Sequence, residues 1–279
     1  MNGWEVLGDS RYELAEGARW HQSRLLFTDL HAGVLYGGAE RPRRLLSLEM
    51  PLGAVAPVEG GGWIIAAGTG IAVVRDGAPR WLADVGRPGV RIRMNDAVCD
   101  PSGRFWAGSM ADDGAVGEGS LYRVDPDGSV HRALDGLGVP NGPAFTACGT
   151  RMYLADSAQR TVRCFEVDPC TGALGRSRVF ARWRTSEGRP DGLAVDDEAH
   201  LWVAVWGAGE LHRYSPRGVL VRRVRTPTLQ PTSVAFGDGH LYATTARYRM
   251  DEPDPVAGAI LRRRCAVGAT PAEVCSLSV

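Results

Sequence analysis

The chain has 279 residues, of which 44% are hydrophobic and 23% are charged, and its formal net charge at pH 7 is zero. This balance argues against a polyanionic partner, so we expect neither nucleic acid nor a membrane as a partner. All 32 positively charged side chains are arginine, which excludes lysine chemistry such as a Schiff base. The N-terminal residues lack the features of a secretion signal, and we expect a cytoplasmic protein.

A short apolar segment with the composition of a β-strand recurs six times along the chain. In chain order these segments are residues 25–29, 63–67, 105–109, 152–156, 201–205 and 241–245. Their starting points are separated by 38, 42, 47, 49 and 40 residues. One four-stranded blade of a β-propeller has this length, so the repeat predicts a six-bladed propeller.

Further strands are expected on both sides of each segment. In the clearest case an apolar run at 192–196 and a polar turn precede the segment 201–205, and a third strand follows at 210–214. A comparable third strand at 120–124 follows the segment 105–109. The sequence has no long amphipathic helical stretch, which indicates an all-β protein built from antiparallel meanders.

The two ends of the chain are expected to share one blade. The first repeat begins so early that residues 4–14 are left over, whereas the last repeat ends near Arg262 with only three evident strands. Adding the N-terminal segment to the last blade would remove an exposed sheet edge. No linker interrupts the chain, so residues 1–279 are predicted to form a single six-bladed β-propeller domain with four-stranded antiparallel blades.

Polar residues occupy equivalent positions in four of the six repeats. Nine to eleven residues before the apolar segment of their blade lie Glu16, Asn95, Asn141 and Asp191. If the first strand of each blade lines the central axis, these side chains converge at one mouth of the channel. Three of them precede a glycine and could singly be turn residues. Together they predict a site, since clustered carboxylates repel one another unless a cation or a proton compensates.

The side-chain oxygens of this cluster are hard ligands without thiolate or imidazole. Such a set suits Ca²⁺, Mg²⁺ or Mn²⁺, and it would accept Zn²⁺ less specifically. Three protein ligands would leave coordination positions open for water and substrate, as in catalytic sites. We therefore expect one divalent metal ion, whose identity the sequence leaves open.

Five ordered motifs between about Tyr12 and Arg247 carry a resemblance to a known family. The motifs are EGARW at 16–20, RMND at 93–96 with DPSGRFWAGSM at 100–110, PNG at 140–142 with ADS at 155–157, PDG at 190–192 with LWVA at 201–204, and PTS at 231–233. In these motifs the chain resembles the regucalcin (senescence marker protein) and gluconolactonase family of metal-dependent propeller lactonases.

The resemblance implies a metal site and a general base. It implies that Glu16, Asn141 and Asp191 ligate the metal, which would polarise the lactone carbonyl and stabilise the tetrahedral oxyanion. Asp191 would also act as the catalytic general base on the attacking water.

The resemblance also implies how the substrate is held. Arg93, Asn95 and Glu118 would bind it, because Arg93 offers a planar fork of donors and Asn95 can both donate and accept. Glu118 lies in a glycine-rich stretch at 112–119, which we expect to form a loop over the rim. Asp96 is expected to support the site rather than to bind the metal.

The leading functional hypothesis is a hydrolase that opens a small lactone, with a sugar-derived aldonolactone as the expected substrate and a monomer or small homo-oligomer as the expected assembly. Ala18 stands where the family commonly has proline, and the segment after Arg247 departs from the family pattern, so the substrate stays open. The same metal and base could instead serve a cyclase, an isomerase or another ring-processing enzyme of specialised metabolism. A non-catalytic propeller that binds a metal or ligand is the third alternative.

Overall fold

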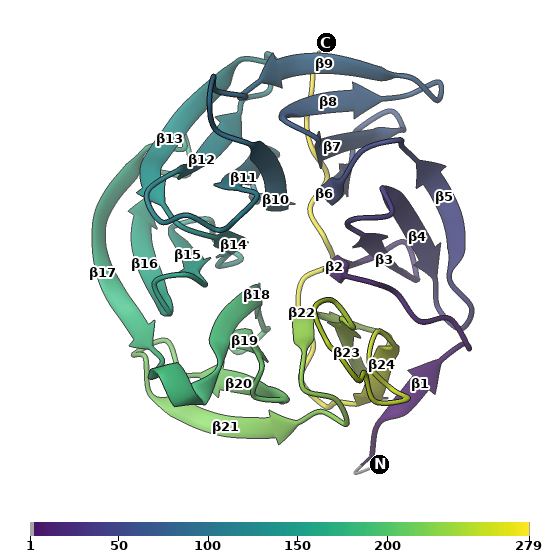
Figure 1. Cartoon of the computed structure of the whole chain (residues 1–279). Helices are drawn as coiled ribbons and strands as arrows, with labels where there is room; N and C mark the ends of the chain where they lie inside the picture. The colour runs from purple at the N-terminus through teal and green to yellow at the C-terminus, as the bar shows by residue number, and fades with distance from the viewer. Residues whose placement is uncertain (1–2, 279) are drawn as a thin grey trace.

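In a computed structural model that describes residues 3–278, twenty-four strands form six antiparallel sheets of four strands each. Figure 1 shows the six sheets standing as blades in a ring around a central axis. The only helix among the described residues is the 3₁₀ turn η1 (Thr185–Glu187). The predicted all-β six-bladed propeller is therefore confirmed.

Blades one to three follow one another along the chain, each running from the axis outward. Their strands are β2 (Ala15–His21), β3 (Arg24–Asp29), β4 (Val34–Gly38) and β5 (Arg43–Ser47); β6 (Leu52–Pro57), β7 (Trp63–Ala67), β8 (Gly70–Val74) and β9 (Pro79–Asp84); and β10 (Ile92–Cys99), β11 (Phe105–Ala111), β12 (Gly119–Val124) and β13 (Val130–Leu137).

Blades four to six complete the ring. Their strands are β14 (Pro140–Phe145), β15 (Arg151–Asp156), β16 (Thr161–Val167) and β17 (Leu174–Arg182); β18 (Arg189–Val195), β19 (Leu201–Trp206), β20 (Glu210–Tyr214) and β21 (Leu220–Arg225); and β22 (Pro231–Gly237), β23 (His240–Thr245), β24 (Ile260–Arg264) and β1 (Glu5–Leu7).

The six apolar segments that recur in the sequence form the second strand of every blade. These strands are buried on both faces between neighbouring blades, which explains why a strand such as β19 is apolar throughout. The outermost strands face solvent and carry exposed polar residues, as β5 does. Burial thus decreases from the axis to the rim.

The N-terminal strand closes the ring, as predicted. β1 pairs with β24 in antiparallel register, with Glu5 opposite Arg262 and Leu7 opposite Ile260. The side chain of Leu7 is only 3% exposed. Closure leaves β24 paired on both sides and joins the two ends of the fold through one sheet.

The C-terminal residues 265–278 cross one face of the ring, visible as the yellow trace behind the blades in Figure 1. The amide of Ala272 donates to the carbonyl oxygen of Trp20 at 2.9 Å, and the amide of Cys275 donates to that of Pro57 at 2.8 Å. Trp20 and Pro57 lie at the C-terminal ends of innermost strands. The tail therefore covers the mouth opposite the one at which those strands begin.

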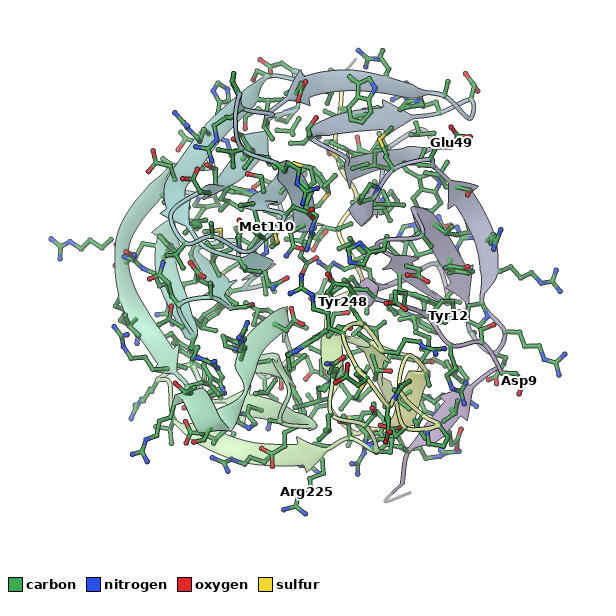
Figure 2. The ribbon with its side chains drawn as sticks, in the orientation of Figure 1. Asp9, Tyr12, Glu49, Met110, Arg225 and Tyr248 are labelled. Carbon is green, nitrogen blue, oxygen red and sulfur yellow. The ribbon has the colours of Figure 1, made fainter. Side chains whose placement is uncertain are left out.

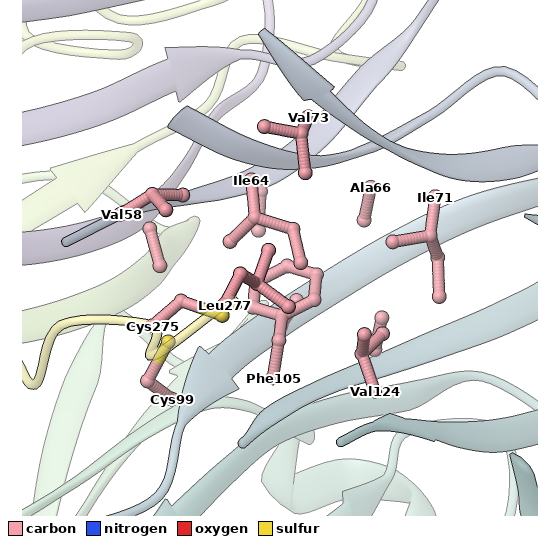
Figure 3. Packing of buried hydrophobic residues seen from close by; sticks show 14 of the residues in the cluster. Val58, Ile64, Ala66, Ile71, Val73, Cys99, Phe105, Val124, Cys275 and Leu277 are labelled. Atoms are coloured by element: carbon pink, nitrogen blue, oxygen red, sulfur yellow. The ribbon is translucent and has the colours of Figure 1, made fainter. Parts of the chain in front are cut away.

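The tail is also packed into the core between blades two and three. Figure 3 shows Cys275 and Leu277 beside Cys99, Phe105 and Val58, all of which are buried. A cavity of about 180 Å³ remains between the tail and the ends of β2, β10, β14, β18 and β22. Among the described residues no helix is long and apolar enough to cross a membrane.

Candidate functional site

Each innermost strand carries a bulge near its N-terminal end. The register with the second strand of the blade shifts between Glu16 and Arg19 in β2, between Asn141 and Ala144 in β14, and at corresponding places in the other four blades. A bulge breaks the alternation of side chains and re-aims them. The bulges therefore lie where the sequence predicts converging polar residues.

A chain of hydrogen bonds links three blades at this mouth. The Nη1 of Arg93 donates to the Oδ1 of Asn95 at 2.7 Å, and the Nδ2 of Asn95 donates to the Oδ1 of Asn141 at 2.8 Å. The Nδ2 of Asn141 then donates to the Oγ of Ser157 at 2.8 Å, and Ser157 donates to the carbonyl oxygen of Pro190 at 2.6 Å. Both amides are thereby held in one orientation, and the Oδ1 of Asn141 keeps a lone pair.

Two buried carboxylates lie at the same mouth and form no ion pair, although the charge of Arg93 reaches both of them. Glu16 and Asp191 are 6% and 5% exposed, and neither belongs to an ion pair within the described part of the chain. The Oε2 atom of Glu16 is buried and has no hydrogen-bond partner among those residues. Burial raises the pKa of Glu16 well above its ordinary value, and the charges of Asp191 and Asp96 raise it further. Burial, followed by the charge of Asp96, likewise raises the pKa of Asp191.

Asp96 differs from these two carboxylates because it has partners of its own. Arg19 approaches its Oδ1 to 3.3 Å, and the backbone amides of Ala97 and Gly142 donate to its two oxygens at 2.8 and 2.9 Å. The bond from Gly142 joins blade four to blade three. Asp96 thus braces the strands beneath the mouth.

Arg93 has a donor atom at this mouth that lacks a partner in the described part of the chain. Burial lowers the pKa of its guanidinium, and its Nε has no hydrogen-bond partner within residues 3–278. The side chain of Asp112 comes only to 3.8 Å from this atom. A buried donor that makes no hydrogen bond costs free energy. A ligand oxygen that accepted a hydrogen bond from this Nε would therefore be stabilised.

Glu118, on the loop between β11 and β12, has its hydrogen-bond contacts with Arg87. Its side chain is 38% exposed and pairs with the Nη2 of Arg87 at 2.8 Å. Among the described residues no hydrogen bond joins it to Arg93 or Asn95. The structure thus brings together five of the six predicted site residues. The sixth, Glu118, pairs with Arg87 instead.

Other residues of this mouth have no role that the sequence predicts. Ser157 orients Asn141, and its signal was present in the ADS motif at 155–157. Ser233 accepts a hydrogen bond from the amide of Ala18 at 2.9 Å and ties blade six to blade one. Tyr248 lies near the centre of the ring in Figure 2, and no motif marked it.

The donor set at the mouth suits a hard divalent cation. Glu16 and Asp191 would supply two charges, and the amide oxygen of Asn141 would supply a neutral ligand. Within residues 3–278 no three His, Cys, Asp or Glu side chains lie close enough together to share a metal, so a cation here would depend on Asn141 as well. The unpartnered Oε2 of Glu16 fits such an occupant.

Comparison with known proteins now places the chain in a family. Residues 14–247 match the family described as "SMP-30/Gluconolactonase/LRE-like region". The chain belongs to this family. The resemblance noted in the sequence is thereby confirmed.

Its relatives include named lactonases. The chain is 35% identical over 259 residues to the pentonolactonase XacC of Haloferax volcanii, covering 85% of this chain and 83% of that protein. It is 34% identical over 271 residues to the L-arabinolactonase of Azospirillum brasilense, covering 91% of this chain and 89% of that protein. Among solved structures, the calcium-binding protein regucalcin from Agrobacterium tumefaciens has a TM-score of 0.89 at 26% identity, covering 98% of this chain and 97% of that one.

Proposed function

We propose that the protein is a metal-dependent hydrolase that opens a small lactone, with sugar-derived aldonolactones as its substrates. One observation carries the proposal: Glu16 and Asp191 are buried beside a fixed amide oxygen, form no ion pair within residues 3–278, and leave the Oε2 of Glu16 without a hydrogen-bond partner there. Two relatives named for their action on pentonolactones and arabinolactone support the substrate class. Regucalcin, described as calcium-binding, supports a divalent ion.

Glu16, Asn141 and Asp191 are the residues that would hold the ion. When bound, a divalent ion supplies Lewis-acid polarisation of the lactone carbonyl and stabilises negative charge on its oxygen. Arg93 would donate to the ring hydroxyls. Asn95 already donates both of its N–H groups, to Pro140 and to Asn141, so it would accept from a ring hydroxyl through the remaining lone pair of its Oδ1.

Asp191 would act on the water. Its carboxylate would accept a proton as the water oxygen attacks the carbonyl carbon, and it would return this proton to the ring oxygen as the acyl–oxygen bond breaks. The product is the open-chain hydroxy acid. Burial of Asp191 excludes bulk water and strengthens its interactions with the reacting atoms.

The test compares rate and product in metal-stripped and reloaded protein. Aldonolactones are offered to wild-type protein, to Asp191→Asn and to Asp127→Asn, a matched change on an exposed turn of blade three. We expect metal-dependent acid release in wild type and Asp127→Asn and a loss of at least about a hundredfold in Asp191→Asn. A product of unchanged mass would instead favour an isomerase, and full activity after metal removal would refute the proposal.

A further inference from the structure

The loop between β23 and β24 enters the mouth that contains the candidate site. Thr245, the last residue of β23, pairs with Pro231 at the start of the innermost strand β22. The next residue, Ala246, forms a bridge with Leu14, two positions before Glu16. The residues after Ala246 therefore leave the sheet beside the buried carboxylates. This is the segment in which the sequence departs from its family's pattern.

Tyr248 anchors this loop at the mouth. It packs against the buried cluster of Leu14, Leu30 and Ala246. The centroid of its ring lies 4.7 Å from that of His31. Figure 2 shows Tyr248 close to the centre of the ring of blades. Its aromatic face is thus fixed by apolar contacts and can serve as a platform.

Arg249 lies on that platform. Its guanidinium carbon is 4.9 Å from the centroid of the Tyr248 ring, within the range of a cation–π contact. The backbone of Arg249 has a φ of +57°, a left-handed conformation uncommon for residues other than glycine. The turn that imposes it is closed by a bond from the amide of Met250 to the carbonyl oxygen of Arg247 at 3.2 Å. Such a conformation often marks a functional position.

The guanidinium of Arg249 has no anionic partner in the described chain. Arg249 is exposed and takes part in none of the ion pairs within residues 3–278. Its charge also reaches the buried Arg93, whose pKa is lowered first by burial and further by Arg249. Two arginines therefore lie near each other at this mouth.

Acidic groups accompany the other arginines near this mouth. Asp112 lies 3.3 Å from Arg91 and 3.8 Å from Arg93, and the charge of Glu16 also reaches Arg93. A divalent ion would offset the two buried carboxylates of the candidate site. Arg249 forms no ion pair within residues 3–278, so its guanidinium is free to attract an anionic group of a ligand.

We propose that the substrate is a lactone bearing a free carboxylate, and that Arg249, held over Tyr248, binds this carboxylate while Arg93 binds the ring. The inference rests on the proposed lactonase function and narrows its substrate class to lactones of sugar diacids. Arg249 has the chemistry for this role, because a guanidinium stacked on an aromatic ring keeps its planar edge free to bind both oxygens of a carboxylate.

The test uses two lactones that differ in one group. Glucaro-γ-lactone carries a terminal carboxylate where glucono-γ-lactone carries a hydroxymethyl group. For metal-loaded wild type we expect a kcat/KM about tenfold or more in favour of the acid, corresponding to one charge-assisted contact. The preference should weaken as salt is added, since the contact is partly exposed.

Variants of the loop distinguish a direct contact between Arg249 and the carboxylate from a general electrostatic attraction by the loop. Arg249→Gln should abolish the preference, mainly through KM for the acid, and Tyr248→Ala should weaken it. Tyr248→Phe keeps the ring and should retain it. Arg247→Gln is the matched control, because it removes one positive charge from the same exposed loop and should leave the preference intact.

A binding measurement makes the result independent of turnover. Tetrahydrofuran-2-carboxylate has no ester and can be titrated calorimetrically, with tetrahydrofurfuryl alcohol as its neutral counterpart. We expect tetrahydrofuran-2-carboxylate to bind and its neutral counterpart not to bind. The affinity for the carboxylate should fall about tenfold in Arg249→Gln. Equal hydrolysis of both lactones, unchanged in Arg249→Gln, would overturn this inference and leave the lactonase proposal standing. Arg249-dependent binding without hydrolysis of any lactone would support the carboxylate site and refute the lactonase.

Discussion

Asn95 donates a hydrogen bond from its Nδ2 to the Oδ1 of Asn141, 2.8 Å away on the neighbouring blade. The bond fixes the amide of Asn141, so the oxygen proposed to bind a cation does not exchange places with the nitrogen. Groups that orient a metal ligand are often as important to affinity as the ligand itself. The candidate site therefore depends on contacts between blades as well as on the residues of each blade.

Replacing Asn95 with alanine should weaken cation binding without removing a ligand. Asn141 would lose the donor that orients it, and we expect the affinity for Ca²⁺ to fall about tenfold or more. Isothermal titration calorimetry on metal-stripped protein measures this directly. Gln159→Ala is a suitable control, because Gln159 bonds to Asp156 outside the site. An unchanged affinity in Asn95→Ala would contradict the proposed role of Asn141.

Metal-free protein should lose stability as pH rises. The folded-state pKa values of Glu16 and Asp191 lie above their ordinary values of 4.5 and 3.8. The folded state then binds more protons than the unfolded state between each ordinary pKa and the raised one. The contribution of these carboxyls to the free energy of unfolding is therefore complete below the ordinary pKa and is lost as pH rises through the folded-state pKa.

Urea unfolding of wild type and Glu16→Gln in a chelator, at a series of pH values, measures this effect. Glu16→Gln should be the more stable protein at neutral pH, and the gap between the two should close toward acid. Ca²⁺ should stabilise wild type more than the variant, because it binds the folded state. A gap that widens toward acid would show that Glu16 is compensated within the protein.

Blade two has a glycine, Gly53, where four other blades have polar site residues. The packing of the blade requires a residue without a side chain at this position. A Cβ atom at Gly53 would collide with the backbone carbonyl of Asn95. Gly53→Ala should therefore destabilise the protein by about 1–3 kcal/mol and lower activity by displacing Asn95. Gly60→Ala would be a poor control although the turn is open, because Gly60 has a φ of +78° and alanine would be strained there. Gly86→Ala is the better control, since its nearest neighbour at 3.1 Å is the end of the exposed Asp84 side chain. Equal stability of Gly53→Ala and Gly86→Ala would contradict the close packing of β6 on β10.

Closure of the ring by β1 should contribute strongly to stability. Leu7 is 3% exposed in the blade shared by the two chain ends, and Leu7→Ala should lower the free energy of unfolding by about 2–4 kcal/mol. Val116→Ala, at a side chain 62% exposed, should change it by less than about 0.5 kcal/mol. Denaturant titration of both variants tests this. Similar values for the two would indicate that the N-terminal strand is dispensable.

The sequence predicts the fold well because the repeat is itself the fold. Each apolar segment is buried on both sides, so its composition predicts a strand. The number and spacing of these segments predict the number of blades. The equivalent positions of Glu16, Asn141 and Asp191 follow from the same repeat. Convergence at one mouth can therefore be expected before any contact is known.

Features that lie outside the repeat could not be predicted in this way. Glu118 pairs with Arg87 at the rim, a contact between two loop residues that no periodicity reveals. The loop that carries Tyr248 and Arg249 has a path determined by local turns and packing. The irregular tail covers the far mouth through backbone bonds such as that from Ala272 to Trp20, which sequence pattern does not encode.

A cation at the mouth is proposed to be required for lactone hydrolysis. Metal-stripped protein is titrated with Ca²⁺, and the bound ion and the hydrolysis of an aldonolactone are measured on the same samples. We expect both to rise together, to saturate at one ion per chain, and to be lost together in Asp191→Asn. Hydrolysis at full rate in samples without bound ion, or saturation of the ion without any hydrolysis, would contradict this proposal.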